Sequence, residues 1–214
     1  MSHVVLVPAK PPAAGKTRLR GLPDGVRRDL AEAFALDTVA ACLATDGVDH
    51  VMAVTDDAGF ARRLAAMGCA VLPDGVADDL NGTLVQAAVE AARRWPVSRV
   101  AAVCADLPAL RPADLALALR RASSHAQAFV ADAEATGTTC YVADLGAFRP
   151  AFGPDSRTQH LALGAVEIRD DTAGDLASLR RDVDDLEDLE EAHRLGLGPQ
   201  SHLRNMQRGW VTGR

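Results

Sequence analysis

The sequence has few aromatic residues and no surplus of positive charge, and both features restrict what the protein can be. Phe, Trp and Tyr make up only 4% of the 214 residues, although 48% are hydrophobic. Ala, Val and Leu must therefore build most of the core, which is large enough for one domain. The formal net charge is −6, whereas proteins that coat nucleic acid usually carry a strong basic surplus. We therefore expect no nucleic-acid partner.

Cysteine and long apolar runs are also scarce. The four cysteines are scattered along the chain and form neither a CxxC pair nor a Cys/His cluster. Reduced thiols in a cytosolic protein are the simplest interpretation. The first apolar stretch, residues 4–7, is too short for the core of a signal peptide, and no run of about twenty apolar residues follows. We expect a cytoplasmic protein with no membrane partner.

Short β-branched runs alternate with longer amphipathic runs in the first half of the chain. Expected strands cover 3–7, 48–54, 69–72 and 99–104. Expected helices cover 24–44, 57–67, 80–95 and 112–123. This alternation predicts an α/β fold with a mostly parallel sheet covered by helices on both faces. Ligands of such sheets bind beyond the carboxyl ends of the strands.

The second half of the chain is less regular. Expected elements are strands at 128–131, 139–142 and 165–168 and a charged helix at 185–195. No internal repeat or interdomain linker is visible. The sequence loses clear periodicity near its end, so we expect a single domain over residues 1–198 and a tail over 199–214 that is disordered at least in part.

A loop rich in cations follows the first expected strand. It carries Lys10, Lys16 and Arg18 together with Gly15 and Thr17. Backbone N–H groups and cations in such a loop can converge on phosphate oxygens, with the arginine gripping two oxygens and the lysine acting as a mobile charge. The loop is not a P-loop, because the position five residues before Gly15 is Lys10 instead of glycine. A solvated surface loop is the alternative.

Acidic residues occur at two places that suit a hard divalent cation. Asp106 follows the buried run 99–104, where a carboxylate can hold a metal or cap the next helix. Asp182 and Asp184 are two residues apart, so in an extended segment they point to the same face. Without a partner such as Asp106 they would read as an acidic surface turn. Asp185 is better explained as a helix N-cap.

Three further segments suit an anionic or hydroxyl-rich ligand, although each is also compatible with an ordinary turn or cap. Residues 136–139 (TGTT) offer hydroxyls and backbone N–H groups, and residues 152–156 (FGPDS) form a turn sequence followed shortly by His160. Asn81 opens an expected helix and either reads a base edge or caps that helix. The six histidines form no hydrolase triad and no zinc-ligand spacing.

Taken together, these segments resemble the 2-phospho-L-lactate/phosphoenolpyruvate guanylyltransferase family of coenzyme F-420 biosynthesis. The matching motifs, in order, are Lys10, KTRL at 16–19, DLPAL at 106–110, FVAD at 129–132, GTT at 137–139, FGPDS at 152–156, His160, GA at 164–165 and DVD at 182–184. They extend over roughly residues 4 to 198. One departure is Asp185, where relatives often have Thr, and this leaves the metal-ligand geometry open.

The resemblance implies a single-domain, Rossmann-like nucleotidyltransferase fold of the GT-A type with a mixed central sheet. It implies that Lys10, Lys16, Thr17 and Arg18, together with Asn81, bind GTP. Lys16, Arg18 and Asp106 would be catalytic, and Asp106 would hold Mg²⁺ with Asp182 and Asp184. The phosphorylated acid would be held by Thr138, Gly153 and Ser156.

The reaction implied by the resemblance transfers GMP from GTP to a small phosphorylated acid and releases pyrophosphate. Related family members accept phosphoenolpyruvate, 2-phospho-L-lactate or 3-phosphoglycerate, and phosphoenolpyruvate is favoured by analogy with actinobacterial relatives. The next enzyme of the pathway would accept the product. Two alternatives remain: a nucleotidyltransferase for molybdopterin or a sugar phosphate, and a non-catalytic GTP-binding domain. The first typically has an LAGGxSxRxG loop, which this chain lacks. A homodimer through an apolar sheet edge is also open.

Overall fold

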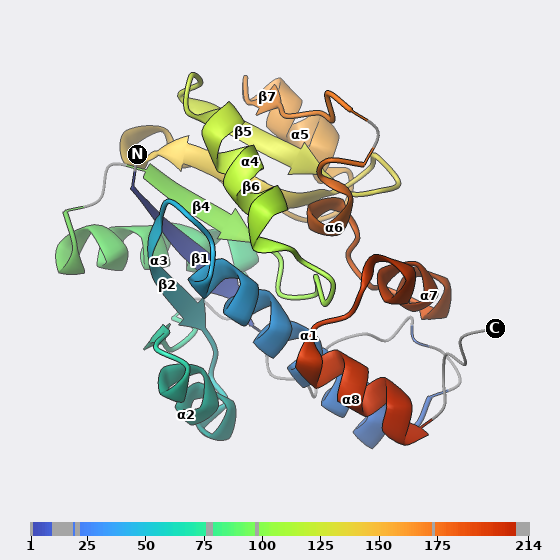
Figure 1. Cartoon of the computed structure of the whole chain (residues 1–214). Helices are drawn as coiled ribbons and strands as arrows, with labels where there is room; N and C mark the ends of the chain where they lie inside the picture. The colour runs from blue at the N-terminus through green and yellow to red at the C-terminus, as the bar shows by residue number, and fades with distance from the viewer. Residues whose placement is uncertain are drawn as a thin grey trace.

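A seven-stranded mixed sheet forms the centre of the protein, in the order β3-β2-β1-β4-β6-β5-β7 (Figure 1). The computed structural model describes residues 2–9, 19, 22–75, 79–96, 99–172 and 174–208. The strands are β1 (His3–Pro8), β2 (Val48–Val54), β3 (Ala70–Leu72), β4 (Arg99–Val103), β5 (Gln127–Ala131), β6 (Thr138–Asp144) and β7 (Val166–Glu167). Strand β6 is antiparallel to both its neighbours, and the other pairs are parallel. The predicted mixed, mostly parallel sheet is confirmed.

Helices connect the strands and cover the sheet. They are α1 (Asp24–Leu43), α2 (Ala58–Ala66), α3 (Leu80–Arg94), α4 (Pro112–Ala122), η2 (Leu145–Ala147), α5 (Ser156–Ala162), α6 (Ala177–Arg180), α7 (Leu186–Leu195) and α8 (Pro199–Arg208). Local chemistry sets several starts: Asp57 and Asp79 cap α2 and α3 through their carboxylates, and Pro112 occupies the first turn of α4. No helix in the described ranges is long and apolar enough to cross a membrane.

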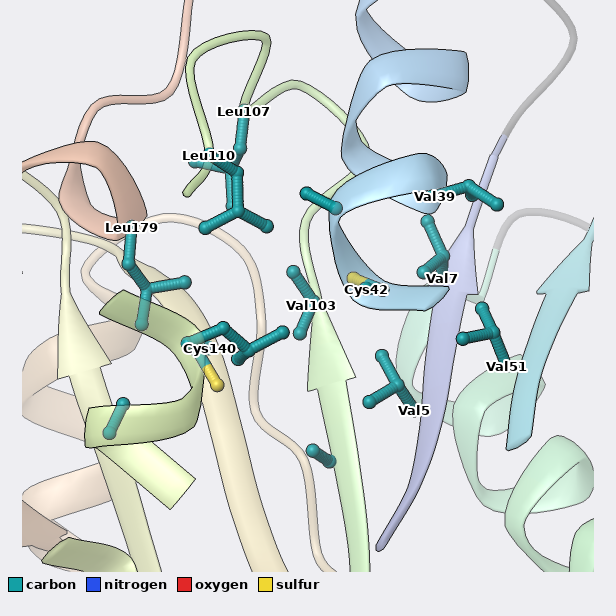
Figure 2. Packing of buried hydrophobic residues seen from close by; sticks show 14 of the residues in the cluster. Val5, Val7, Val39, Cys42, Val51, Val103, Leu107, Leu110, Cys140 and Leu179 are labelled. Atoms are coloured by element: carbon teal, nitrogen blue, oxygen red, sulfur yellow. The ribbon is translucent and has the colours of Figure 1, made fainter. Parts of the chain in front are cut away.

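The two faces of the sheet bury alternate residues of each strand, as the two-residue period of a strand requires. Val5 and Val7 of β1 face one core, where Figure 2 shows them beside Val39 and Cys42 of α1. Val4 and Leu6 face the other core, which contains the buried side of α3. Many packing positions are Ala or Val, which explains how a core forms with so few aromatic residues.

A third hydrophobic cluster lies beside the sheet and joins distant parts of the chain. It packs Phe34 of α1 and Leu189 of α7 around Val183 and Ala109. Ala109 belongs to the segment that follows β4, and Val183 belongs to the segment that precedes α7. This cluster therefore brings together the two segments that carry the predicted metal ligands.

The C-terminal segment differs from the expectation of an irregular tail, because residues 199–208 form helix α8. The helix packs against α1 (Figure 1). The buried carboxylate of Asp37 in α1 accepts hydrogen bonds from the backbone N–H groups of Gln200 at 3.0 Å and Ser201 at 2.7 Å. A cap supplied by another helix cannot be recognised from the local sequence, and helix α8 was therefore not predicted. Residues 209–214 lie outside the described structure.

Candidate active site

Three carboxylates meet beyond the carboxyl end of β4. Asp106, Asp182 and Asp184 each offer a carboxylate oxygen, and these three atoms lie within 4.8 Å of one another. All three side chains are half-buried. Oxygen ligands at this spacing suit a hard divalent cation. The structure thus brings together the three residues that were predicted from the sequence as metal ligands.

One backbone hydrogen bond determines on which side of the chain the carboxylates of Asp182 and Asp184 lie. The N–H of Val183 donates to the carbonyl oxygen of Asp106 at 3.0 Å, and the Val183 side chain is fully buried. The segment belongs to none of the seven strands of the sheet, but it is held against residue 106 much as a strand would be. With Val183 turned into the core, Asp182 and Asp184 point to the other side, towards Asp106.

The segment that carries Asp106 is anchored by α1 and by the chain before α8. The buried Thr38 of α1 accepts a hydrogen bond from the N–H of Leu107 at 3.1 Å and donates to the carbonyl oxygen of Phe34 at 2.9 Å. The N–H of Gly198 donates to the carbonyl oxygen of Pro108 at 2.8 Å. These bonds fix the backbone on both sides of the carboxylate.

Two further acidic residues of this segment, Asp185 and Asp188, cap the N-terminus of α7. Asp185 accepts hydrogen bonds from the N–H groups of Glu187 at 2.9 Å and Asp188 at 3.1 Å. Asp188 in turn accepts from the N–H of Asp185, which completes a capping box. The prediction that Asp185 is an N-cap is confirmed.

A cleft of about 510 Å³ adjoins the carboxylate cluster and is lined almost entirely by acidic side chains. Arg181 is the one cation among its described lining residues, and it pairs with Glu134 at 2.8 Å and Asp188 at 2.9 Å. An anionic nucleotide would be repelled by this surface unless cations neutralise it. The arrangement is therefore suited to binding cations first.

The candidate acceptor residues gather beside the same end of β4. Thr138 begins β6, and its carbonyl oxygen lies 3.4 Å from the sulfur of Cys104, two residues before Asp106. The buried Ser156 begins α5, and its Oγ lies close to Gly137, where an added Cβ would come within 3.8 Å of it. Gly153 has a φ of 135°, a conformation that favours glycine.

The loop before Thr138 is shaped by a carboxylate whose role the sequence analysis did not identify. Asp132 accepts hydrogen bonds from the N–H groups of Thr136 at 2.9 Å and Gly137 at 2.7 Å. A Cβ added at Gly137 would lie 2.4 Å from the Asp132 carboxylate oxygen. Gly137 is therefore required for the backbone to approach this carboxylate. The signal was present in the sequence as an Asp at the end of a strand with a Gly five residues later.

Asn81 does not cap helix α3, which was one of its two sequence interpretations. Its carboxamide donates to the carbonyl oxygen of Phe152 at 2.9 Å and accepts from the N–H of Phe152 at 2.8 Å. Helix α3 is capped by Asp79 instead, through the N–H of Gly82 at 2.9 Å. A carboxamide has a second N–H and a second lone pair beyond these two bonds, and the nucleotide contact of Asn81 stays a prediction.

The predicted phosphate-binding residues Lys10, Lys16, Thr17 and Arg18 lie outside the described residues. The chain on either side of them is placed. Ala9 follows β1 and donates its N–H to Val54 at 2.9 Å, and Leu19 is buried in the third hydrophobic cluster with α1. The loop therefore starts at the carboxyl end of the strand next to β4.

The α/β sheet has the fold of the nucleotidyltransferases, as two solved structures show. One is described as a nucleotide-diphospho-sugar transferase from Desulfovibrio desulfuricans, with a TM-score of 0.73, 18% identity and coverage of 98% of this chain and 97% of that one. Another is 4-diphosphocytidyl-2C-methyl-D-erythritol synthase, with a TM-score of 0.61, 12% identity and coverage of 91% and 98%. No family model matches the chain.

Similarity to curated proteins identifies the family. The chain is 46% identical over 198 residues to the phosphoenolpyruvate guanylyltransferase of Thermomonospora curvata, covering 92% of this chain and 86% of the relative. It is 46% identical over 203 residues to the enzyme of the same name from Streptomyces coelicolor, covering 94% of each. The protein belongs to the phosphoenolpyruvate guanylyltransferase family. The family predicted from the sequence motifs is confirmed.

Proposed function

We propose that this protein transfers a GMP unit from GTP to the phosphate group of phosphoenolpyruvate and releases pyrophosphate, an early step of coenzyme F-420 biosynthesis. The observation that carries the proposal is the convergence of Asp106, Asp182 and Asp184 in a chain 46% identical to enzymes with this name. A protein that only bound GTP would have little need for such a cluster.

The donor set of the cluster fits Mg²⁺. Three carboxylate oxygens within 4.8 Å of one another match the preference of this ion for oxygen ligands. Asp106, Asp182 and Asp184 would hold the ion. When bound, Mg²⁺ would neutralise charge on the phosphates and orient them.

In the proposed reaction, a phosphate oxygen of the acceptor attacks the α-phosphorus of GTP. The bond between this phosphorus and the oxygen bridging to the β-phosphate breaks, and pyrophosphate leaves. The attacking oxygen is ionised at neutral pH, so no general base is needed. The work of the protein is alignment and charge neutralisation, with Lys16 and Arg18 expected to contact the GTP phosphates and Lys10 and Thr17 to assist.

The acceptor would be held by Thr138, Gly153 and Ser156. Their support is positional, since Thr138 adjoins the chain before Asp106 and Ser156 adjoins Gly137. A hydroxyl pair and an exposed glycine backbone suit a carboxylate or phosphate of a small acid. The product, in which the phosphate of the enol acid and the phosphate of GMP are joined as a diphosphate, would be passed to the next enzyme of the pathway.

The test is to incubate the purified protein with GTP and Mg²⁺ and to offer phosphoenolpyruvate, 2-phospho-L-lactate and 3-phosphoglycerate separately. Pyrophosphate release and product mass are recorded for each acid, with the next pathway enzyme added to trap unstable product. We expect release that depends on phosphoenolpyruvate. Release only with one of the other acids would correct the acceptor, and silence with all three in protein that binds GTP would refute the proposal.

A further inference from the structure

A histidine lies buried next to the candidate acceptor site, away from the carboxylate cluster. His160 of α5 has no exposed surface. Its ring lies among the rings of Tyr141, Phe129 and Phe152, with centroid separations of 4.7, 5.4 and 5.6 Å. A polar ring enclosed in this way costs free energy unless both its nitrogens find partners. The partners of the two nitrogens therefore indicate the role of the His160 ring.

The two ring nitrogens have different partners, and these determine where the proton is. Nε2 lies 3.0 Å from the backbone nitrogen of Ala151, whose N–H donates to it. A nitrogen that accepts a hydrogen bond carries no proton, so in a neutral ring the proton is on Nδ1. Burial lowers the pKa of His160 to about 4, although a hydrogen bond to the Ser156 backbone opposes this, so the ring is neutral at pH 7.

The position of this proton defines the direction of the next hydrogen bond. Nδ1 lies 3.0 Å from Oγ1 of Thr138. Because Nδ1 carries the proton, it cannot accept from the Thr138 hydroxyl, whose hydrogen must therefore point away from the ring. The hydrogen of the Thr138 hydroxyl is therefore not used by the ring and is free to be donated to another group. A donor is what an anionic acceptor oxygen requires.

The same ring also supports the turn that carries Gly153. Its Nε2 accepts a hydrogen bond from the N–H of Ala151. The carboxamide of Asn81 is hydrogen-bonded to both the N–H and the carbonyl oxygen of Phe152. The two residues before Gly153 are thus fixed from two sides. His160 therefore connects the strand that bears one candidate acceptor contact to the turn that bears another.

We propose that His160 is a positioning residue of the acceptor site, which keeps the hydrogen of the Thr138 hydroxyl free for donation to the phosphorylated acid and holds the turn leading to Gly153. This inference deepens the proposed function and rests on it. It assigns His160 no contact with the substrate and no proton transfer.

The first test reads the tautomer directly and does not depend on activity. The ¹⁵N chemical shifts of the His160 ring are measured by NMR at pH 7 in the full-length protein, with His160→Gln used to assign the signals. We expect a protonated Nδ1 and an unprotonated Nε2. A ring protonated on Nε2, or a charged ring, would overturn the inference even in an active enzyme.

The second test is a double-mutant cycle on the acceptor kinetics. Thr138→Val removes the hydroxyl and keeps the shape of the side chain. His160→Gln places an oxygen near the position of Nε2, which retains the hydrogen bond from the N–H of Ala151, but it removes the N–H that faces Thr138. A lost hydrogen bond to an anion corresponds to about a ten- to hundredfold loss in kcat/KM. We expect each single change to cost this much, mainly through the KM for the acid, with GTP affinity unchanged. In the Thr138→Val background, His160→Gln should add less than about threefold.

His160→Asn provides the rescue variant, because its side-chain amide can donate from near the position of Nδ1. We expect His160→Asn to recover most of the affinity for the acid that His160→Gln loses. Additive losses in the cycle, or equal losses in the Asn and Gln variants, would show a merely structural role and overturn the inference. If the unmodified protein turns over none of the three acids, the proposed function fails, and the NMR result alone then decides whether His160 directs the Thr138 hydroxyl.

Discussion

The backbone N–H of Val183 and the carbonyl oxygen of Asp106 are joined by a hydrogen bond of 3.0 Å. This bond connects the segment after β4 to the segment before α7, which are far apart in the sequence. It also fixes which neighbours of Val183 face Asp106. The geometry of the carboxylate cluster therefore depends on a backbone contact as well as on the acidic side chains.

Asp106→Asn should reduce turnover by a factor on the order of 10² to 10³, because it removes a charged ligand from the proposed metal site. The fold should persist, since Asn has nearly the same shape. Pyrophosphate release and the thermal unfolding midpoint are measured together. The matched control is Glu187→Gln, which removes a charge from the same acidic cleft outside the cluster. Turnover like that of the unmodified enzyme in folded Asp106→Asn would remove this residue from the metal site.

Gly137→Ala should disturb the loop before Thr138, because the new Cβ would lie 2.4 Å from the Asp132 carboxylate. We expect kcat/KM for the acid to fall at least tenfold, since displacement of this loop moves the Thr138 hydroxyl. The control is Gly146→Ala, where an added Cβ meets nothing within 4 Å. Equal kinetics for both variants would mean that the loop adjusts without consequence for the acceptor.

Asp37→Ala should lower the free energy of unfolding by about 1–2 kcal/mol, because the carboxylate caps α8 through the N–H groups of Gln200 and Ser201. The loss is measured by urea denaturation, with the exposed Asp46→Ala as control. Gly198, next to α8, also donates a hydrogen bond to Pro108 in the segment that carries Asp106. We therefore expect a modest loss of activity as well. An unchanged stability would indicate that the Asp37 cap of α8 contributes nothing to the free energy of unfolding.

The stability of the protein should fall as the pH decreases from about 6.5 to about 4, with a contribution from His160. Its pKa is lowered by burial from 6.5 to about 4, so in this window the unfolded chain binds a proton that the folded protein does not. The slope from this residue is at most about 1.4 kcal/mol per pH unit, and above pH 6.5 it vanishes. Urea denaturation at pH 7 and pH 5 measures it.

The matched comparison for this pH dependence uses two histidine variants. His160→Gln should reduce the stability difference between the two pH values, whereas His202→Gln, on an exposed position of α8, should leave it unchanged. The buried His3 contributes in the same direction, because burial also lowers its pKa, so some slope should remain in both variants. An identical slope in all three proteins would show that His160 titrates normally.

The local patterns in the sequence predicted most of the helices and strands. They failed where contacts with residues distant in the sequence determine the local structure. Residues 165–168 were expected as a strand, and only Val166–Glu167 pair with β5. Asp182 and Asp184 were expected to share a face because of strand alternation, and they share it without belonging to the sheet. Helix α8 was missed because its cap, Asp37, comes from α1.

The sequence by itself determined the α/β alternation, the family and the residue types of the site, because periodicity and motif order are local properties of the chain. Only the tertiary structure decided that Asp106 meets Asp182 and Asp184, since a buried Val183 and a backbone hydrogen bond close that contact. Only the tertiary structure decided the direction of the bond between His160 and Thr138. The tautomer of a histidine follows from its partners in space, and no neighbour in the sequence specifies them.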